Sequence, residues 1–259
     1  MNTRLFVRTT STCFMLMLLV GFKATAAEIK ALSAIGMQVV MKDLGPKFEN
    51  TSGHKLAITF AAPGAIVQRA LGGEIVDIVI LPRPGIDSLL KDGKALAGSV
   101  TALAQSGIGV AVRTGTPRPD ISSPEALKRT LLAAKLITYS NPAAGTSSGV
   151  HFAKVLDRLG IAGEMKSKTV FSPKAGVVGE LVANGEAEIA VHQFQELIPI
   201  VGIEIVGPLP GDLQDTIVFS AAIMSNATNA AAAKTLVDFL RAPEATAVVK
   251  AKGMEPANP

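Results

Sequence analysis

The sequence predicts an α/β protein made of two similar lobes, each with a mainly parallel sheet and with a ligand cleft between the lobes. Two observations predict this class. The first is that apolar strands at 29–33, 56–60 and 77–81 alternate with helical segments at about 37–49 and 65–71. Alternation of this kind builds βαβ units, whose parallel strands are covered by helices on both faces.

The second observation is a weak internal repeat. Residues 60–80 can be aligned with residues 171–192, with one residue of slack, and each copy contains a strand, a tight turn, a helix, a Gly-Glu corner and a strand. Two copies predict two α/β domains, although a chance similarity of βαβ units is the alternative. The second strands would end at Ile80-Leu81-Pro82 and at His192-Gln193. Ligands of open α/β sheets bind beyond the carboxyl ends of strands, so both ends would face one cleft.

Further helices are predicted later in the chain. Ser123-Pro124-Glu125 has the pattern of a helix start, with Ser as N-cap and Pro at the first helical position. Residues 230–240 and 243–250 are predicted to form the last two helices.

The first 26 residues are predicted to be a signal peptide. Arg4 and Arg8 precede an apolar run at 13–22, and Ala24-Thr25-Ala26 provides small residues for cleavage. The apolar run is shorter than the roughly 20 residues that a membrane span needs. A mature chain that starts at Ala27 or Glu28 would therefore be released into the periplasm.

Composition excludes several classes of function. The only cysteine is Cys13, inside the leader, so the mature chain could form no disulfide, thiolate metal site or thiol nucleophile. Loss of the leader lowers the formal net charge from +4 to +1, and no block of Lys or Arg indicates a nucleic-acid partner. No His, Asp or Glu cluster has the spacing of metal ligands, so neither a metal nor another cofactor is predicted.

Residues 136–160 predict an anion-binding turn, because an apolar strand leads through a Pro- and Gly-containing turn into an amphipathic helix. The first turn of this helix would contain Thr146, Ser147, Ser148 and Gly149. Free backbone N–H groups, hydroxyls and the positive end of the helix dipole all favour a negative ligand there. The alternative is that Ser147 or Ser148 is an ordinary N-cap.

Three cationic side chains are candidates for binding a carboxylate. Arg69 follows the Pro63-Gly64 turn, Arg83 follows a strand end, and Lys174 lies in the corresponding turn of the second repeat. Each of them could instead be a solvated surface residue.

The histidines provide candidates for proton transfer. His54 lies in a polar turn and is predicted to be at the surface. His151 lies one turn into the predicted anion-binding helix, and His192 ends a buried strand beside Gln193. Either could bind a carboxylate or transfer a proton near neutral pH, or could be satisfied within a domain interface.

Several segments together resemble the periplasmic molybdate-binding protein family: Leu32-Ser33-Ala34, Ser52-Gly53-His54-Lys55, Phe60-Ala61-Ala62, Gly73 to Asp77, and the Gly/Ser-rich turn. The resemblance covers essentially the whole mature chain. It implies a type II solute receptor of an ABC importer, with two α/β lobes joined by two crossovers near 107–112 and 206–217. The first lobe would comprise residues 27–107 and 218–259, and the second 108–217.

This chain departs from that family at the ligand. The family carries oxyanion-binding hydroxyls after the first two strands, where this sequence has Gly36 and Pro63-Gly64 and no hydroxyl. Backbone N–H groups of Gly36, Gly64 and Ala65 could still bind an anion there. In contrast, Asn141 to Gly149 and Val191-His192-Gln193 are similar to a subgroup of periplasmic aconitate isomerases. The ligand implied is therefore a small di- or tricarboxylate rather than molybdate.

Two hypotheses about function follow. The first is a monomeric periplasmic receptor that closes on a small anion and delivers it to an ABC permease. The second is an enzyme that interconverts cis- and trans-aconitate in the same cleft by shifting an allylic proton. The second hypothesis needs a base, for which His192 and His151 are the candidates. The sequence leaves both open.

Overall fold

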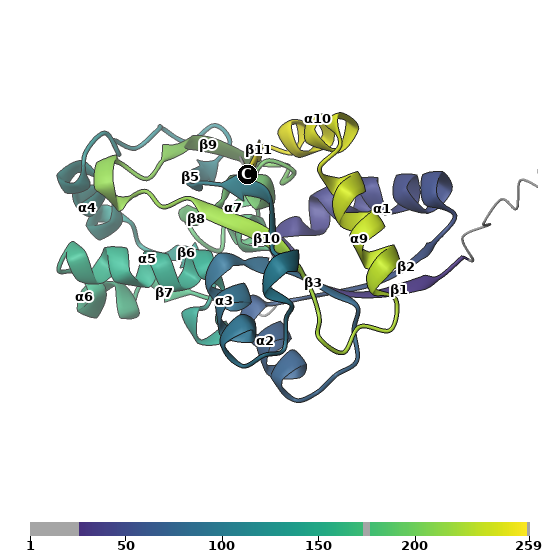
Figure 1. The fold of residues 1–259 in the computed structure, drawn as a ribbon. Helices are drawn as coiled ribbons and strands as arrows, with labels where there is room; N and C mark the ends of the chain where they lie inside the picture. The colour runs from purple at the N-terminus through teal and green to yellow at the C-terminus, as the bar shows by residue number, and fades with distance from the viewer. Residues whose placement is uncertain (1–25, 173–176, 258–259) are drawn as a thin grey trace, which may run out of the picture.

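The protein consists of two lobes that lie side by side, each built on one sheet (Figure 1). The computed structural model describes residues 26–172 and 177–257. The six-stranded sheet has the order β11 (Glu255–Pro256), β4 (Thr101–Ser106), β10 (Ile217–Ile223), β3 (Ile78–Pro82), β1 (Glu28–Ala34) and β2 (Lys55–Ala61). The five-stranded sheet has the order β7 (Thr169–Val170), β6 (Ile137–Tyr139), β8 (Ile189–Gln193), β5 (Ile108–Arg113) and β9 (Ile203–Pro208). The predicted two-lobed α/β class is confirmed.

Helices cover both faces of the first sheet. On one face lie α1 (Gln38–Ser52), α9 (Ala230–Leu240) and α10 (Pro243–Ala251), and on the other lie α2 (Pro63–Leu71) and α3 (Arg83–Lys91) (Figure 1). The predicted strands and helices of this lobe are all present. One detail differs: Pro63-Gly64 opens α2 instead of forming a separate turn, because the fixed φ of Pro suits the first helical position.

The second sheet is covered in the same way. One face packs against α7 (Val178–Ala183) and α8 (Phe194–Leu197), and the other against α5 (Ser147–Arg158), followed by α6 (Ala162–Lys166), which contacts α4 (Pro124–Ala133). The α4 helix starts as predicted, with the Ser123 side chain accepting from the Ala126 N–H at 3.1 Å.

Both sheets contain parallel and antiparallel pairs, because the strands that follow the two crossovers between the lobes run antiparallel to their neighbours. In the first sheet β1 runs parallel to β2 and β3, and in the second β6 runs parallel to β7 and β8. The chain passes from β4 to β5 through Gly107 alone, and returns from β9 to β10 through residues 209–216. The strands β5 and β10 then pair antiparallel to both of their neighbours.

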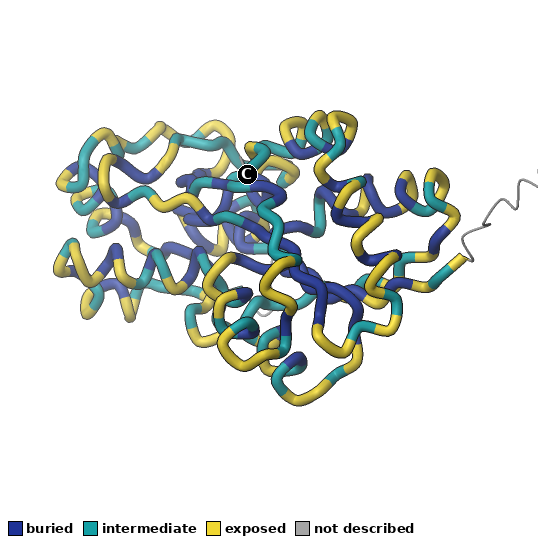
Figure 2. Tube along the Cα trace, in the orientation of Figure 1, coloured by how far each residue is buried: buried dark blue, intermediate teal, exposed yellow. Residues whose placement is uncertain are grey.

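The strands at the centre of each lobe are buried on both faces (Figure 2). Every residue of β3 and of β8 is buried, as expected for strands covered by helices on both sides. At the end of β6, the ring of Tyr139 packs edge-on against Phe152 of α5 and against Phe171, with centroids 5.0 and 5.1 Å away. Among the described helices, none is long and apolar enough to cross a membrane.

Asp77 connects three segments of the first lobe. Its buried carboxylate accepts hydrogen bonds from the backbone N–H groups of Lys30 at 2.8 Å, Thr228 at 2.8 Å and Asn229 at 2.7 Å. Burial alone would raise the pKa of this carboxyl, but these hydrogen bonds together outweigh it and hold the pKa below its usual value. The ionised side chain thus joins β1 and the start of α9 to β3.

Replacing Asp77 should therefore destabilise the fold. We expect Asp77→Ala to lower the free energy of unfolding by roughly 3 kcal/mol, because it leaves buried N–H groups without an acceptor. Urea unfolding of the variant measures this. The control is Asp157→Ala, at an exposed position. If both variants lost less than about 1 kcal/mol, the structural role given to Asp77 would be wrong.

Candidate functional site

A small cavity lies between the lobes at the carboxyl ends of the central strands. Its volume is about 20 Å³, which is room for about one water molecule. The strand ends at Pro82 and at His192-Gln193 both line it, as predicted for strand ends that face one cleft. We call this the inner cavity. Of the site residues predicted from the sequence, it brings together Gly36, Pro63, Thr146, Ser147, Ser148, His192 and Gln193.

Helix N-termini converge on the inner cavity. Four helical segments begin at this cavity, and the N-cap residue of each one lines it. These residues are Ala34 before the 3₁₀ turn Ile35–Met37 that leads into α1, Ala62 before α2, Pro82 before α3 and Thr146 before α5. None of the four makes a side-chain capping hydrogen bond. The first N–H groups and the positive dipole ends of these helices therefore favour an anion. No Lys or Arg in the described part of the chain lines this cavity.

Ser148 places a buried hydroxyl without a partner at this cavity. Its side chain is 2% exposed, and its hydroxyl has no hydrogen-bond partner. A buried hydroxyl without a partner costs free energy that a ligand acceptor would recover. The alternative of an ordinary N-cap at Ser147 or Ser148 is wrong, because the N-cap is Thr146.

Gly149 explains why small residues follow Thr146. A Cβ atom at this position would lie 2.2 Å from the carbonyl oxygen of Ser140 and 2.5 Å from the hydroxyl of Thr146. The first turn of α5 therefore packs directly on the backbone that follows β6. This contact places the helix N-terminus beside Ser140.

His192 is the centre of a buried polar cluster. Its Nε2 lies 2.8 Å from the Ser140 hydroxyl, and its Nδ1 accepts the backbone N–H of Gln193 at 2.7 Å. The same Nδ1 lies 3.2 Å from Oε2 of Glu196. Only 3% of the surface of His192 and 7% of that of Glu196 is exposed. Ser140 and Glu196 also line the inner cavity.

Burial sets the protonation of this pair. It lowers the pKa of His192 to about 4 and raises the pKa of Glu196 to about 8. At neutral pH the imidazole is therefore uncharged, and Glu196 is mainly a protonated carboxylic acid. Shifts of this size in a buried pair are typical of groups that take part in proton transfer.

Gln195 connects the cluster to the other lobe. Its side-chain nitrogen donates to the carbonyl oxygen of Gly36 at 3.1 Å and to the side-chain oxygen of Gln193 at 3.2 Å. Its own oxygen accepts from the Ser106 hydroxyl at 2.5 Å. Gly36 and Ser106 belong to the first lobe, whereas Gln193 and Gln195 belong to the second. This hydrogen-bond network therefore depends on the lobes being closed.

A larger opening, which we call the outer pocket, adjoins the inner cavity. Its volume is about 470 Å³, and the two share Pro63, Pro82 and Ser147. Gly64 and Gly145 line it from opposite lobes, and a Cβ on Gly64 would lie only 3.3 Å from the Cα of Gly145. The close approach of the two backbones at this point needs both glycines.

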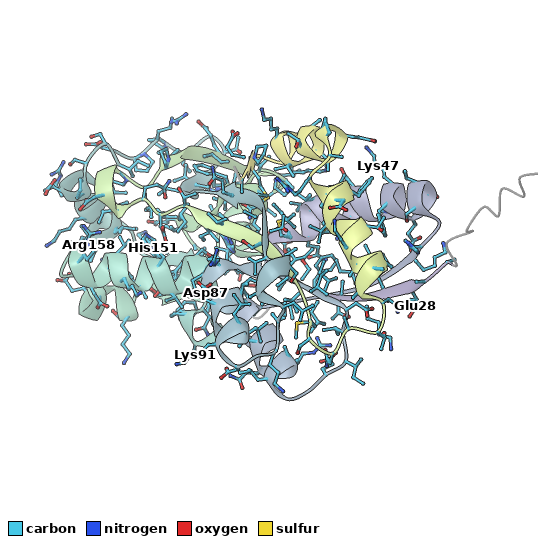
Figure 3. All side chains as sticks on the ribbon, viewed as in Figure 1. Glu28, Lys47, Asp87, Lys91, His151 and Arg158 are labelled. Atoms are coloured by element: carbon cyan, nitrogen blue, oxygen red, sulfur yellow. The ribbon has the colours of Figure 1, made fainter. Side chains whose placement is uncertain are left out.

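His151 lines the outer pocket, not the inner cavity. Its Nε2 donates to the carbonyl oxygen of Leu213 at 2.7 Å, and its Nδ1 lies 3.5 Å from a carboxylate oxygen of Asp215. Figure 3 labels His151 on α5, and Asp87 on α3, the helix that lines the other side of this pocket. Lys154, one turn further along α5, also lines the pocket and is exposed.

The structure does not bring the predicted arginines to the inner cavity. The Nε and Nη2 of Arg69 each donate to a carboxylate oxygen of Glu74 at 2.6 Å. Arg83 pairs with Asp87 one turn along α3, at 2.7 Å, and is exposed. Local acidic partners on the same segment hold both side chains away from the cleft.

Two other predicted positions also differ. Lys174 lies outside the described residues. His54 was expected at the surface, but it is buried, because its Nδ1 accepts the Ala27 N–H at 3.1 Å and its ring stacks on Phe48.

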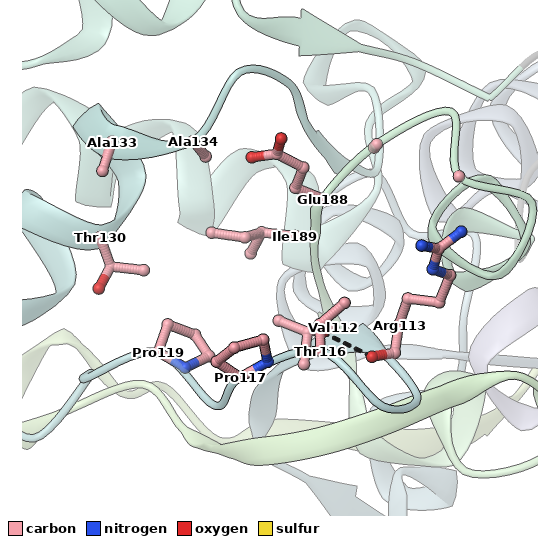
Figure 4. Close-up of a pocket in the computed structure, with 12 residues that line it drawn as sticks. Val112, Arg113, Thr116, Pro117, Pro119, Thr130, Ala133, Ala134, Glu188 and Ile189 are labelled. Carbon is pink, nitrogen blue, oxygen red and sulfur yellow. Dashed lines mark hydrogen bonds between the residues drawn. The ribbon is translucent and has the colours of Figure 1, made fainter.

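Another cavity lies in the second lobe, away from the cleft. Its volume is about 530 Å³, and Figure 4 shows it between the loop of Pro117 and Pro119, the end of α4 and the start of β8. The carboxyl end of α4, where the helix dipole is negative, and the Glu188 side chain both line this cavity, and Arg113 lines it as well. It lacks the converging helix N-termini and the buried titratable pair of the inner cavity.

Ser140, Glu196 and Gln195 are site residues that the sequence analysis missed. The spacing of His192 and Glu196 was visible, but the two lie on different elements, a strand and a helix of four residues. No helix pattern indicated that the chain turns there. Within the described ranges, no group of His, Cys, Asp or Glu is arranged to hold a metal ion.

The fold and the site together define a class, the two-lobed binding proteins that enclose an anion between α/β lobes. Comparison with known families is consistent with this class. A family model described as bacterial extracellular solute-binding protein matches residues 29–255, and the chain belongs to this family.

Individual relatives have two different activities in their names. An aconitate isomerase from Pseudomonas sp. is 33% identical over 234 residues, which cover 88% of this chain and 87% of that protein. The molybdate-binding protein ModA of Azotobacter vinelandii is 28% identical over 242 residues, covering 91% and 92%. Among solved structures, the periplasmic molybdate-binding protein of Azotobacter vinelandii superposes with a TM-score of 0.73 at 21% identity, over 89% of this chain and 99% of that chain.

The buried pair predicts how stability depends on pH. An unfolded Glu ionises near 4.5, whereas folded Glu196 keeps its proton up to about 8, so its ionisation destabilises the fold as the pH rises. His192 has the opposite effect between about 4 and 6.5, because the unfolded imidazole binds a proton there and the folded one does not. The two effects oppose each other up to pH 6.5, and only that of Glu196 remains above it.

We therefore expect the free energy of unfolding to fall by roughly 1 kcal/mol between pH 6.5 and pH 8. Urea titrations across this range measure the fall. Glu196→Gln should abolish it, whereas Glu164→Gln, an exposed control, should retain it. An identical fall in wild type and Glu196→Gln would contradict the assignment.

Proposed function

We propose that this protein is a periplasmic isomerase of small unsaturated polycarboxylates, which interconverts cis- and trans-aconitate by moving one allylic proton. The observation that carries the proposal is the buried pair of His192 and Glu196 at the inner cavity. A receptor needs only to bind a permanently charged anion. A proton shift needs a group that accepts a proton and returns it at neutral pH, and this pair is suited to that task.

The converging helix N-termini support the choice of a carboxylate substrate. They would stabilise the charge that develops on a carboxylate when the adjacent carbon loses its proton. Backbone N–H groups and the free hydroxyl of Ser148 would serve as donors for that charge. Gly36 and Pro63 contribute no hydroxyl at the positions where the molybdate-binding family has one.

The outer pocket supports a substrate with more than one carboxylate. The inner cavity is too small for a tricarboxylate in the closed form, so the lobes would separate at the contact of Gly64 with Gly145 to admit it. The remaining carboxylates would then extend into the outer pocket, where Lys154 offers a positive charge. The sequence similarity to an aconitate isomerase favours the same substrate.

The second candidate function is a periplasmic receptor that binds a small polycarboxylate and delivers it to an ABC permease. Membership of the solute-binding protein family favours it. Its lobes would close on the ligand in the same way, with His192 as a ligand contact. Both candidates place the mature protein in the periplasm, after removal of the leader.

One experiment separates the two functions. Wild-type protein is incubated with cis-aconitate in deuterium oxide and followed by proton NMR. We expect deuterium to enter the substrate and trans-aconitate to form, because the base exchanges its proton with solvent. An unchanged spectrum, together with saturable binding of cis-aconitate, would establish the receptor instead.

Ser148 tests the binding site without catalysis. Tricarballylate, which has no double bond to move, serves as the probe in calorimetry. We expect Ser148→Ala to weaken its binding by about tenfold, since one hydrogen bond to a charged group is lost. The free protein should be no less stable, because the hydroxyl has no partner to lose.

Ser123→Ala provides the matched control. It removes the N-cap of α4, so stability should fall by about 1 kcal/mol while binding stays the same. If Ser148→Ala left the affinity for tricarballylate unchanged, the anion would bind elsewhere.

A further inference from the structure

Neither histidine offers a free lone pair at the inner cavity, because that of His192 is occupied and His151 lines the outer pocket instead. In His192, Nδ1 accepts the backbone N–H of Gln193, so the neutral ring carries its hydrogen on Nε2 and donates it to the Ser140 hydroxyl. In His151, Nε2 donates to a backbone carbonyl and Nδ1 faces Asp215. A base that attacks a C–H bond needs an unoccupied lone pair near the substrate.

The hydrogen-bond network from the other lobe fixes the orientation of Glu196. The carbonyl of Gly36 can only accept, so the side chain of Gln195 must present its nitrogen to it and also to the oxygen of Gln193. Gln193 then presents its nitrogen to Oε2 of Glu196, at 2.9 Å. Oε2 is therefore held between the amide of Gln193 and Nδ1 of His192, which leaves Oε1 as the oxygen that faces no protein group.

Oε1 of Glu196 is the available atom. It has no hydrogen-bond partner in the described part of the protein, and it is not among the fully enclosed atoms that lack one. Glu196 lines the inner cavity, beside Ser148 and the start of α5. The carboxyl thus has one oxygen held by the protein and one free for a substrate.

We propose that Glu196 is the catalytic base of the isomerisation proposed above, and that His192 and Gln193 are positioning residues. Oε1 removes a proton from the methylene carbon of aconitate, so that a C–H bond breaks and an O–H bond forms. The electron pair spreads over the allylic system and the adjacent carboxylate. Glu196 then returns the proton to the other allylic carbon, where a C–H bond forms and the double bond shifts. The step needs no cofactor.

The surroundings of Glu196 determine its pH dependence. Its helix, α8, packs against β5, α7 and β8. Their other titratable side chains, Arg113 and Glu180, are exposed, which leaves His192 as the titratable group that faces Glu196. Because burial raises the pKa of Glu196 to about 8, a minority of molecules carry the active carboxylate at pH 7.

The test measures deuterium exchange into cis-aconitate for the wild type and three variants. We expect Glu196→Gln to slow exchange by at least about a hundredfold while tricarballylate still binds within about threefold of the wild type. His192→Asn should slow exchange less and shift the pH profile, as expected for a positioning residue. Glu180→Gln, an exposed control, should match the wild type.

The pH profile of the wild type provides a second test that needs no variant. The rate should rise by about tenfold per pH unit between pH 6 and pH 7 and level off near pH 8. A flat profile, or unchanged exchange in Glu196→Gln, would overturn the assignment of Glu196. A His192→Asn variant as inactive as Glu196→Gln, with an unshifted profile, would return the role of base to the imidazole.

The outcomes also separate this inference from the proposed function. If the wild type exchanges no deuterium, the proposed isomerase function is wrong, and so is the assignment of Glu196 as its base. If the wild type and the Glu196→Gln variant isomerise aconitate equally well, the protein is an isomerase but Glu196 is not its base.

Discussion

The desolvation of one carboxyl group governs the chemistry of the cleft. Glu196 lies almost fully buried beside a buried imidazole, and among the described side chains no cation lines the cavity to stabilise its charge. The protein therefore stabilises the neutral acid and the neutral ring at the same time. In the proposed function, backbone N–H groups and helix dipoles bind the anion, and they do not form an ion pair with the carboxyl. A nearby Arg or Lys would lower the pKa of Glu196 and remove the proton that the site holds at neutral pH.

The same cavity is assembled from both lobes, and its geometry requires close contact between them. Gly64 and Gly145 allow the backbones to meet, and the Gln195 amide reaches across to the carbonyl of Gly36. A Cβ on Gly36 would lie 2.7 Å from the ring of Phe219, so that turn is equally restricted. The orientation of the Glu196 carboxyl is thus linked to lobe closure. Opening would break the network that holds Oε2.

The fold was predictable because its signals are local and repeated. The continuous apolar runs of β3 and β8 indicate strands buried on both faces, and capping residues such as Ser123 mark helix starts. The N-terminus of α5 was equally visible in its small residues. Arg69 and Arg83 were misleading because nearby acidic side chains, Glu74 and Asp87, bind them, and the sequence alone does not show which ion pairs form. Glu196 was missed because its role depends on a turn of the chain and on burial by both lobes, and neither has a local sequence signal.

The aromatic composition of the chain makes the site easy to observe by spectroscopy. The protein has no Trp and a single Tyr, and that residue, Tyr139, directly precedes Ser140. Its ring is held between Phe152 on the first turns of α5 and Phe171. Near-ultraviolet circular dichroism and intrinsic fluorescence would therefore report chiefly on one phenol ring next to the cleft. The protein thus contains its own optical probe of ligand entry, with no label attached.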